Sequence, residues 1–249
     1  MTPVISIVAD EEEAGSVIAR RIADDIEADP QCAIGVATGS SPLPIYRYLA
    51  VLVDRGLSIG GVDWFALDEY LGLADGHPES YRSILLRDLA RPLSIAPAKL
   101  HLPDPFTDDP DAAAGDYEHE VSDARVRAQI VGIGRNGHLG FNEPGTPLDS
   151  PTHRARLTES TRAANARFFD SIDDVPQWCI TQGLGTIMRA ARIELIATGE
   201  VKADAVARAL YGPVSPDCPA SVLQTHPQVY VTLDAGAASA LPQQKIAAS

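Results

Sequence analysis

Residues 33–49 read AIGVATGSSPLPIYRYL, and this stretch decides the fold class. Residues 33–37 form a short apolar run, which is typical of a strand covered on both faces. The run ends in Thr38, Gly39, Ser40 and Ser41, and a helical pattern follows. A buried strand that leads through a tight turn into a helix predicts one βα unit of a parallel sheet.

The same order of elements recurs along the chain. Apolar residues recur at three- and four-residue steps from Ala14 to Ile26, behind Asp10 as a candidate N-cap. The pattern predicts an α/β fold, a doubly wound and mainly parallel sheet with helices on both faces. The length of 249 residues fits a single domain over residues 1–249. Further predicted helices span residues 47–53, 81–89 and 203–210, and further predicted strands span residues 5–9, 63–67, 129–133, 193–197 and 229–233.

Composition narrows the classes of function. The chain has 20 Lys and Arg against 34 Asp and Glu, a net charge of −14 that disfavours nucleic-acid binding. No apolar stretch suggests a membrane segment, and the N-terminus lacks the pattern of a secretory signal, so we expect a cytoplasmic protein. The three cysteines form no CxxC pair for zinc or redox chemistry. The acidic and turn-rich residues 104–115 are predicted as a surface loop.

In a doubly wound fold, ligands bind beyond the carboxyl ends of the strands, so the residues that follow each strand are the candidates for a site. Thr38, Gly39, Ser40 and Ser41 come first. Hydroxyls, a glycine and the free amides of a helix start are suited to phosphate. The alternative is a tight turn with a serine N-cap. The stretch lacks the lysine of a P-loop and the GxGxxG pattern, so a nucleotide is not indicated.

Acidic residues follow the strand predicted at residues 63–67. Asp68 and Glu69 come directly after it, which places at least one carboxylate on the ligand side of the sheet. A catalytic carboxylate is one interpretation, and a solvated or capping pair is the other.

The strand predicted at residues 129–133 leads into the stretch 132–144, GIGRNGHLGFNEP. His138 lies in a glycine-rich turn with Glu143 nearby, and the two side chains could relay a proton. A metal site is disfavoured, because there is no HExxH pattern and no second histidine at ligand spacing. A satisfied structural histidine is the alternative interpretation.

Lys202 follows the strand predicted at residues 193–197 and stands at the start of a helix. A cation is unfavourable there unless an anion offsets it, so a bound phosphate is one interpretation and an exposed lysine the other. The four signals together suit proton transfer on a small phosphorylated molecule, as in sugar-phosphate isomerisation or hydrolysis.

Several motifs, in this order and spacing, resemble the glucosamine-6-phosphate deaminase (isomerase) family. The resemblance implies a Rossmann-like sheet and conversion of glucosamine 6-phosphate and water to fructose 6-phosphate and ammonia, without a cofactor. The motifs are ATGSSPLPIY, FALDEYLGL, SYRSIL, GIGRNGHLGFNEPG, THRARLTESTRAANARFF, ITQGLGTIM, ATGEVKADAV and PASVLQTHPQVYV.

The resemblance also implies roles for individual residues. His138, supported by Glu143 and Asn136, would assist opening of the sugar ring, and Asp68 would move the C2 proton to C1. The phosphate would be held by Thr38, Gly39, Ser40, Ser41, Arg167 and Lys202. Residues 158–176 are expected to form a lid.

The chain departs from the family pattern at two places. Many members carry Asp where this chain has Asn136, which can orient His138 by hydrogen bonding but cannot stabilise an imidazolium by charge. Members that form allosterically activated hexamers carry basic residues where this chain has His153 and Ala155, and serines where it has Thr146 and Pro147. We therefore expect no such activation, and a monomer or homodimer rather than a hexamer.

Two other functions remain as alternatives. A 6-phosphogluconolactonase would share the TGS turn and the GxxGH turn, but the family lacks the DEY and FNEP forms seen here. A sugar-responsive sensor without catalysis would be expected to carry a DNA-binding segment ahead of the first strand, and the net negative charge disfavours it. The sequence does not separate glucosamine from galactosamine 6-phosphate.

Overall fold

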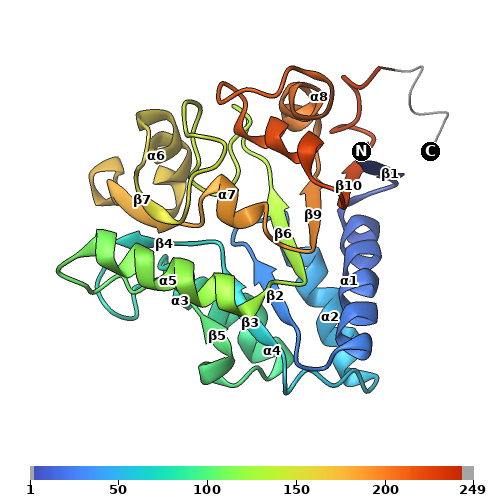
Figure 1. Ribbon diagram of the computed structural model, residues 1–249, viewed down its shortest axis with the longest axis horizontal. Coiled ribbons are helices and arrows are strands. Elements are labelled where there is room, and N and C mark those ends of the chain that lie inside the picture. The colour runs from blue at the N-terminus through green and yellow to red at the C-terminus, as the bar shows by residue number, and fades with distance from the viewer. Residues whose placement is uncertain (1–2, 243–249) are drawn as a thin grey trace.

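The computed structural model describes residues 3–242. Its centre is a seven-stranded sheet in the order β1-β10-β9-β6-β2-β3-β5, and every neighbouring pair is parallel (Figure 1). The six predicted strands are confirmed, and the seventh, two residues long, is too short to show an apolar pattern. The strands are β1 (Val4–Val8), β2 (Ala33–Val36), β3 (Asp63–Ala66), β5 (Leu100–His101), β6 (Ala128–Gly132), β9 (Arg192–Ala197) and β10 (Val229–Asp234).

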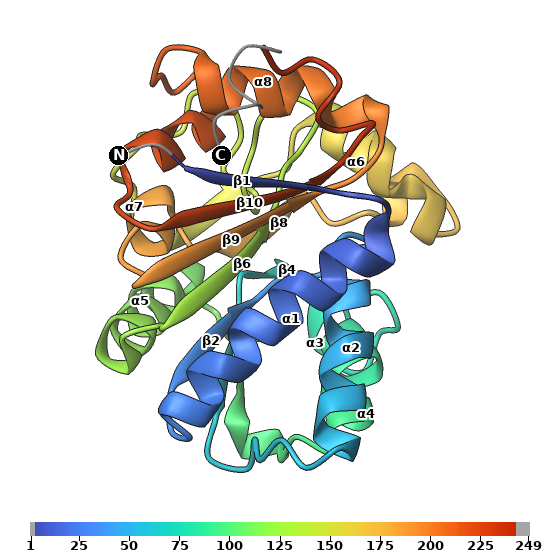
Figure 2. The same cartoon turned by 90° about the vertical axis from the view of Figure 1, so that its right-hand side faces the viewer.

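Helices cover both faces of this sheet, as predicted. Figure 1 places α1 (Glu11–Ala28) and α2 (Leu43–Asp54) to the right of the sheet, and Figure 2 shows the same packing from the side. Alternate strand residues face opposite ways, so Ile130 packs with the first group of helices and Val131 with the second. The first group also includes α3 (Tyr81–Leu85), a π-helical turn (Leu86–Ala90) and α4 (Arg91–Leu93), and the second comprises α5 (Pro110–Ala124), α7 (Leu184–Ile187) and α8 (Ala203–Tyr211).

Residues at the starts of two helices determine where those helices begin. Asp10 caps α1 by accepting a hydrogen bond from the backbone of Glu13 at 2.8 Å, as predicted. The prediction of a loop over residues 104–115 is wrong at its second half, because α5 begins at Pro110. Asp109 caps that helix and the proline stands at its first position, a sequence that also occurs in turns.

A second, antiparallel sheet was not predicted. It has the order β4-β8-β7, with β4 (Asp68–Leu71), β8 (Trp178–Thr181) and β7 (His153–Arg156). Strand β4 follows β3 after Leu67 alone, so the chain passes directly from one sheet to the other. Figure 1 shows β7 next to α6 (Glu159–Asn165), which is followed by short 3-10 turns at Ala166–Phe168 and Ile172–Asp174.

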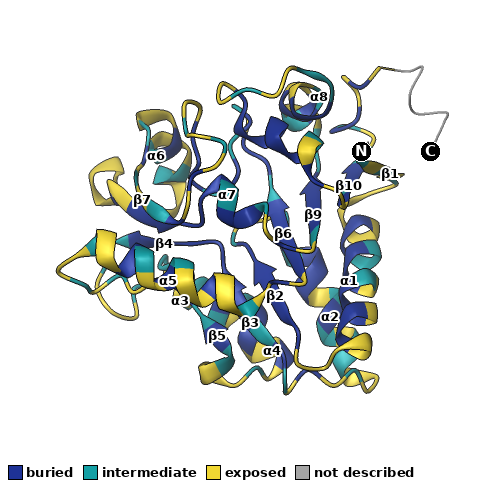
Figure 3. Cartoon of the chain, viewed as in Figure 1, coloured by how far each residue is buried: buried dark blue, intermediate teal, exposed yellow. Residues whose placement is uncertain are grey.

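The topology selects one position on the large sheet for a ligand. The chain builds β3 and β5 on one side of β2, then places β6, β9 and β10 on the other side. The connections after β2 and β6 therefore leave the sheet in opposite directions, which opens a crevice at their carboxyl ends. Figure 3 shows that the strands beneath this crevice are buried. Among residues 3–242, no helix has both the length and the apolar character needed to cross a bilayer.

Candidate active site

The turn after β2 presents polar groups to the crevice. Gly39 has a φ of 98° and, like Ser40, is exposed, while Thr38 and Ser41 are half-buried. The N-cap of α2 is Pro42, whose side chain makes no capping hydrogen bond, so the alternative of a serine N-cap is wrong. Within residues 3–242 the three hydroxyls of this turn bond to no other group, and they remain available to a ligand.

Lys202 reaches the same crevice from the start of α8. Its Nζ donates to the backbone oxygen of Ile133, just after β6, at 2.7 Å, and the residue is half-buried rather than an exposed lysine. Burial lowers the pKa of Lys202, and the positive charges of Arg135 and Arg167 lower it further. Three cations therefore gather near the ends of β6 and β9.

Arg135 was not among the residues predicted from the sequence. It is exposed in the turn after β6, as Arg167 is in the 3-10 turn Ala166–Phe168, where its guanidinium lies 4.6 Å from the centre of the Phe168 ring. Within the described residues neither arginine pairs with a carboxylate. The sequence signal that could have identified Arg135 is its position in the same glycine-rich turn as His138.

His138 lies in that turn with its ring against Gly134. A β-carbon on Gly134 would stand 2.3 Å from both Cε1 and Nε2 of the ring, so only glycine leaves room for it. Its Nδ1 is buried and lies 3.6 Å from Oε1 of Glu143, longer than a hydrogen bond. The predicted pair is therefore close enough for an electrostatic contact.

Asn136 and two threonines hold Glu143. The side-chain amide of Asn136 donates to Oε2 of Glu143 at 2.6 Å, and its oxygen accepts from the backbone of His138 rather than from the ring. Thr158, the N-cap of α6, and Thr161, in its first turn, both donate to Oε1 of Glu143. Burial favours the neutral form of Glu143, but the nearby His138 ring and these hydrogen bonds outweigh it and lower its pKa to about 2.

Asp68 and Glu69 have different surroundings. Asp68 begins β4, is 5% exposed, and accepts no hydrogen bond and pairs with no cation within residues 3–242. Burial, and then the charge of Glu69, raise the pKa of Asp68 well above its usual value. Glu69 instead accepts hydrogen bonds from the backbone amides of Tyr70, Tyr81 and Arg82. Glu69 therefore fixes the start of α3, and Asp68 is left as the reactive candidate.

Asp68 also stands against the turn that carries His138. A β-carbon on Gly140 would lie 3.3 Å from Oδ2 of Asp68 and 2.9 Å from Oγ1 of Thr181, and Gly140 has a φ of 56°. The close approach and the left-handed backbone both require glycine here. Gly140 is two residues after His138 in the chain, so the structure places the Asp68 carboxylate against the turn that carries His138.

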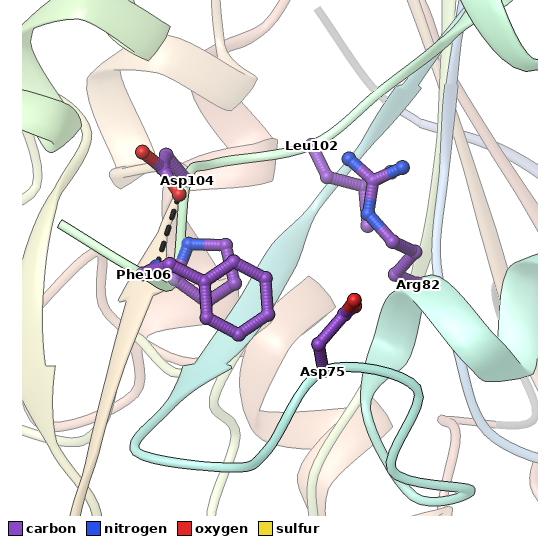
Figure 4. A pocket seen from close by; sticks show the side chains of 6 residues that line it. Asp75, Arg82, Leu102, Asp104 and Phe106 are labelled. Carbon is purple, nitrogen blue, oxygen red and sulfur yellow. Dashed lines mark hydrogen bonds between the residues drawn. The ribbon is translucent and has the colours of Figure 1, made fainter.

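A surface hollow of about 500 Å³ lies apart from this cluster and contains none of the predicted site residues. Figure 4 shows Phe106 on one side of it and Arg82 on the other, with Asp75 at the lower rim. Its other lining residues are Leu102, Asp104 and Pro105. In the part of the chain that the structure describes, no cluster of three or more His, Cys, Asp or Glu residues is arranged to hold a metal ion.

The fold and the crevice define a Rossmann-like α/β protein whose site is suited to a small phosphorylated ligand. The chain belongs to the family described as glucosamine-6-phosphate isomerases/6-phosphogluconolactonase, whose model matches residues 9–231. The predicted family resemblance and fold class are therefore confirmed.

Comparison with individual relatives shows which members of the family this chain resembles. The chain is 47% identical over 238 residues to the glucosamine-6-phosphate deaminase of Pseudarthrobacter chlorophenolicus, covering 95% of this chain and 92% of the relative. It is 48% identical over 250 residues to that of Bifidobacterium longum, covering 96% and 93%. A solved monomeric glucosamine-6-phosphate deaminase matches with a TM-score of 0.92 and 40% identity, over 95% of this chain and 99% of that one. A 6-phosphogluconolactonase from Trypanosoma cruzi, 19% identical with a TM-score of 0.76 over 96% of this chain and 97% of that one, shares the fold.

Proposed function

We propose that this protein converts glucosamine 6-phosphate and water to fructose 6-phosphate and ammonia. The observation that carries the proposal is the buried Asp68 carboxylate, which pairs with no cation within residues 3–242 and lies beside the turn of His138, in a crevice that also gathers cations. The names of relatives that are 47–48% identical over nearly the whole chain support it.

The phosphate of the substrate binds at the carboxyl ends of β2, β6 and β9. Amides and hydroxyls of the turn from Thr38 through Gly39 and Ser40 to Ser41 donate to its oxygens, and Arg167 and Lys202 offset its charge. This binding energy fixes the sugar, so that the reacting carbons C1 and C2 lie near Asp68 and His138.

His138 assists opening of the pyranose ring. Its ring takes the proton of the anomeric hydroxyl and returns a proton to the ring oxygen, which leaves an open-chain aldehyde. Glu143 stays ionised beside it and stabilises the imidazolium, while Asn136 holds Glu143 and the backbone of His138 in place. These roles follow from the electrostatic contact between Glu143 and the ring.

Asp68 then moves one proton. It removes the proton from C2, which the adjacent aldehyde makes acidic, and an enolamine forms. It returns a proton to C1, which leaves an imine at C2; water adds there, and the C–N bond breaks to release ammonia and leave the ketone. A buried carboxylate suits both directions of transfer, because burial and the charge of Glu69 raise its pKa well above its usual value and so make it a stronger base for the C2 proton.

The proposal includes organisation as well as chemistry. Residues 1–249 act as one domain in the cytoplasm, and residues 158–176 act as a lid over the sugar. Within that segment Arg162 donates to the backbone oxygens of Ile172 and Val175, which supports movement as one unit. A monomer or homodimer is supported by the monomeric deaminase of similar fold, and by His153 and Ala155 in place of basic residues.

The test is ammonia release from glucosamine 6-phosphate by the purified protein, run beside Asp68→Asn. The proposal expects release by the unmodified protein and a loss of at least about a hundredfold in the variant. Release from galactosamine 6-phosphate alone would change the substrate. Hydrolysis of 6-phosphogluconolactone without ammonia release would contradict the proposal.

A further inference from the structure

We propose that Arg135 is a third cation that binds the phosphate of the substrate, together with Arg167 and Lys202. This inference rests on the proposed function, since it assigns another residue to the same site. It adds a substrate-binding role to a residue of the turn that carries His138.

The placement of Arg135 follows from contacts on both sides of its turn. Lys202 Nζ bonds to the oxygen of Ile133, two residues before Arg135, which joins the α8 start to this turn. Gly132, at the end of β6, lies against Ser41: a β-carbon there would stand 3.9 Å from the Ser41 β-carbon. The turn therefore lies between the Thr38–Ser41 segment and Lys202, at the switch point of the sheet.

The three cations of this region form no ion pair with any described carboxylate. The chain has 34 acidic against 20 basic residues, yet within residues 3–242 no carboxylate pairs with Arg135, Arg167 or Lys202. Burial lowers the pKa of Lys202 most, and the charges of Arg135 and Arg167 lower it further, so each arginine repels Lys202. An anion bound among them removes this repulsion, and a phosphate dianion offers the charge and the oxygen atoms to pair with all three.

An arginine suits this position better than a lysine would. Its planar guanidinium can donate two parallel hydrogen bonds to phosphate oxygens, and the exposed side chain has room to turn toward a ligand. Because phosphate binding is expected to be much the same before and during the reaction, its loss should weaken affinity more than turnover.

Arg135→Ala tests the inference. We expect KM for glucosamine 6-phosphate and the inhibition constant of inorganic phosphate to rise in parallel, each by about tenfold, with a smaller effect on kcat. Arg135→Lys should recover part of both. Arg55→Ala, which removes an exposed arginine at the far end of α2, is the matched control and should change neither.

Two results would overturn the inference. The first is a KM and an inhibition constant for Arg135→Ala that equal those of the Arg55→Ala control. The second is a fall in kcat with an unchanged inhibition constant, which would mean that Arg135 acts on the His138 turn. Calorimetric titration with inorganic phosphate separates this inference from the proposed function, because it needs no turnover. Weaker phosphate binding by Arg135→Ala in a protein that releases no ammonia would support Arg135 and contradict the deaminase; unchanged phosphate binding in an active deaminase would do the reverse.

Discussion

The hydroxyl of Thr161 donates to the carboxylate of Glu143, and so ties helix α6 directly to the acid that faces His138. Thr161→Val removes this donor while keeping the side-chain shape. We expect kcat/KM to fall about tenfold, the usual cost of one hydrogen bond to a charged group, with most of the loss in kcat. Thr161→Ser keeps the hydroxyl and should retain most activity. Equal losses in the two variants would contradict a role for the hydroxyl.

Gly134→Ala should disable the enzyme without unfolding it. The added β-carbon would stand 2.3 Å from the His138 ring, which must move, whereas the backbone of Gly134 does not need a positive φ. We expect kcat to fall by about a hundredfold, since misplaced catalytic groups lose activity steeply. Gly115→Ala, in helix α5, is the control, because nothing lies within 4 Å of the added β-carbon. Thermal unfolding of both variants shows whether the fold survives, and full activity in Gly134→Ala would refute this account.

The pH dependence of kcat/KM should report Asp68. As the base, Asp68 must be ionised, and burial and Glu69 raise its pKa well above the value of about 3.9 for an exposed aspartate. Activity should therefore rise with pH along an acid limb placed well above pH 4. Glu143, with a pKa of about 2, is ionised throughout and adds no limb. A limb near pH 4 would show that another carboxylate controls the reaction.

Asp68→Asn should stabilise the protein that it inactivates. The pKa of Asp68 is higher in the fold than in the unfolded chain, so its ionisation opposes folding. This penalty is absent below the unfolded pKa and complete above the folded one. At pH 7 we expect the Tm of Asp68→Asn to exceed that of the unmodified protein by a few degrees, with no such gain for the exposed control Asp108→Asn. A lower Tm would mean that the Asp68 charge is compensated.

The ion pairs of the buried Glu194, in β9, should stabilise the fold more than an ion pair at the surface. Glu194 is 0% exposed and bonds to Arg21 at 2.7 Å and to Arg192 at 2.8 Å. Glu194→Gln takes the carboxylate from Arg21, whose side chain is 21% exposed, while Arg192 keeps its pair with Asp25. Burial raises the pKa of Glu194 although both arginines oppose the shift, so removing its charge offsets part of the loss, and we expect the free energy of unfolding to fall by about 2 kcal/mol. Glu12→Gln breaks the exposed pair with Arg47 and should cost less than about 1 kcal/mol. Denaturant unfolding measures both, and equal costs would contradict the burial argument.

The sequence predicted the parts of the molecule that depend on neighbours along the chain. The apolar run of β2 and the turn that follows it lie within a few residues, and the Asp10 cap needs only the helix behind it. Strand β7, HRAR, carries no apolar pattern, because its residues are half-buried or exposed and only pairing with β8 makes it a strand.

For the site, too, the sequence predicted the contacts within one stretch but not those between distant segments. His138 and Glu143 share one turn, so their association could be predicted from a single stretch. The contact of Thr161 with Glu143 and the approach of Arg135 to Lys202 join segments that only the folded chain brings together. The different surroundings of Asp68 and Glu69 likewise depend on the amides at the start of α3, which lie beyond any pattern in DEY.

Because the chain passes from β3 directly into β4, each of the two sheets carries residues of the site. Asp68 belongs to the small sheet, where it pairs with Thr181 from a distant part of the sequence, whereas the phosphate-binding turn belongs to the large sheet. Local opening of the small sheet would carry the base away while the large core stays folded. Activity can therefore be lost at denaturant concentrations that leave most of the secondary structure intact, and a bound sugar phosphate that touches both sheets would delay that loss.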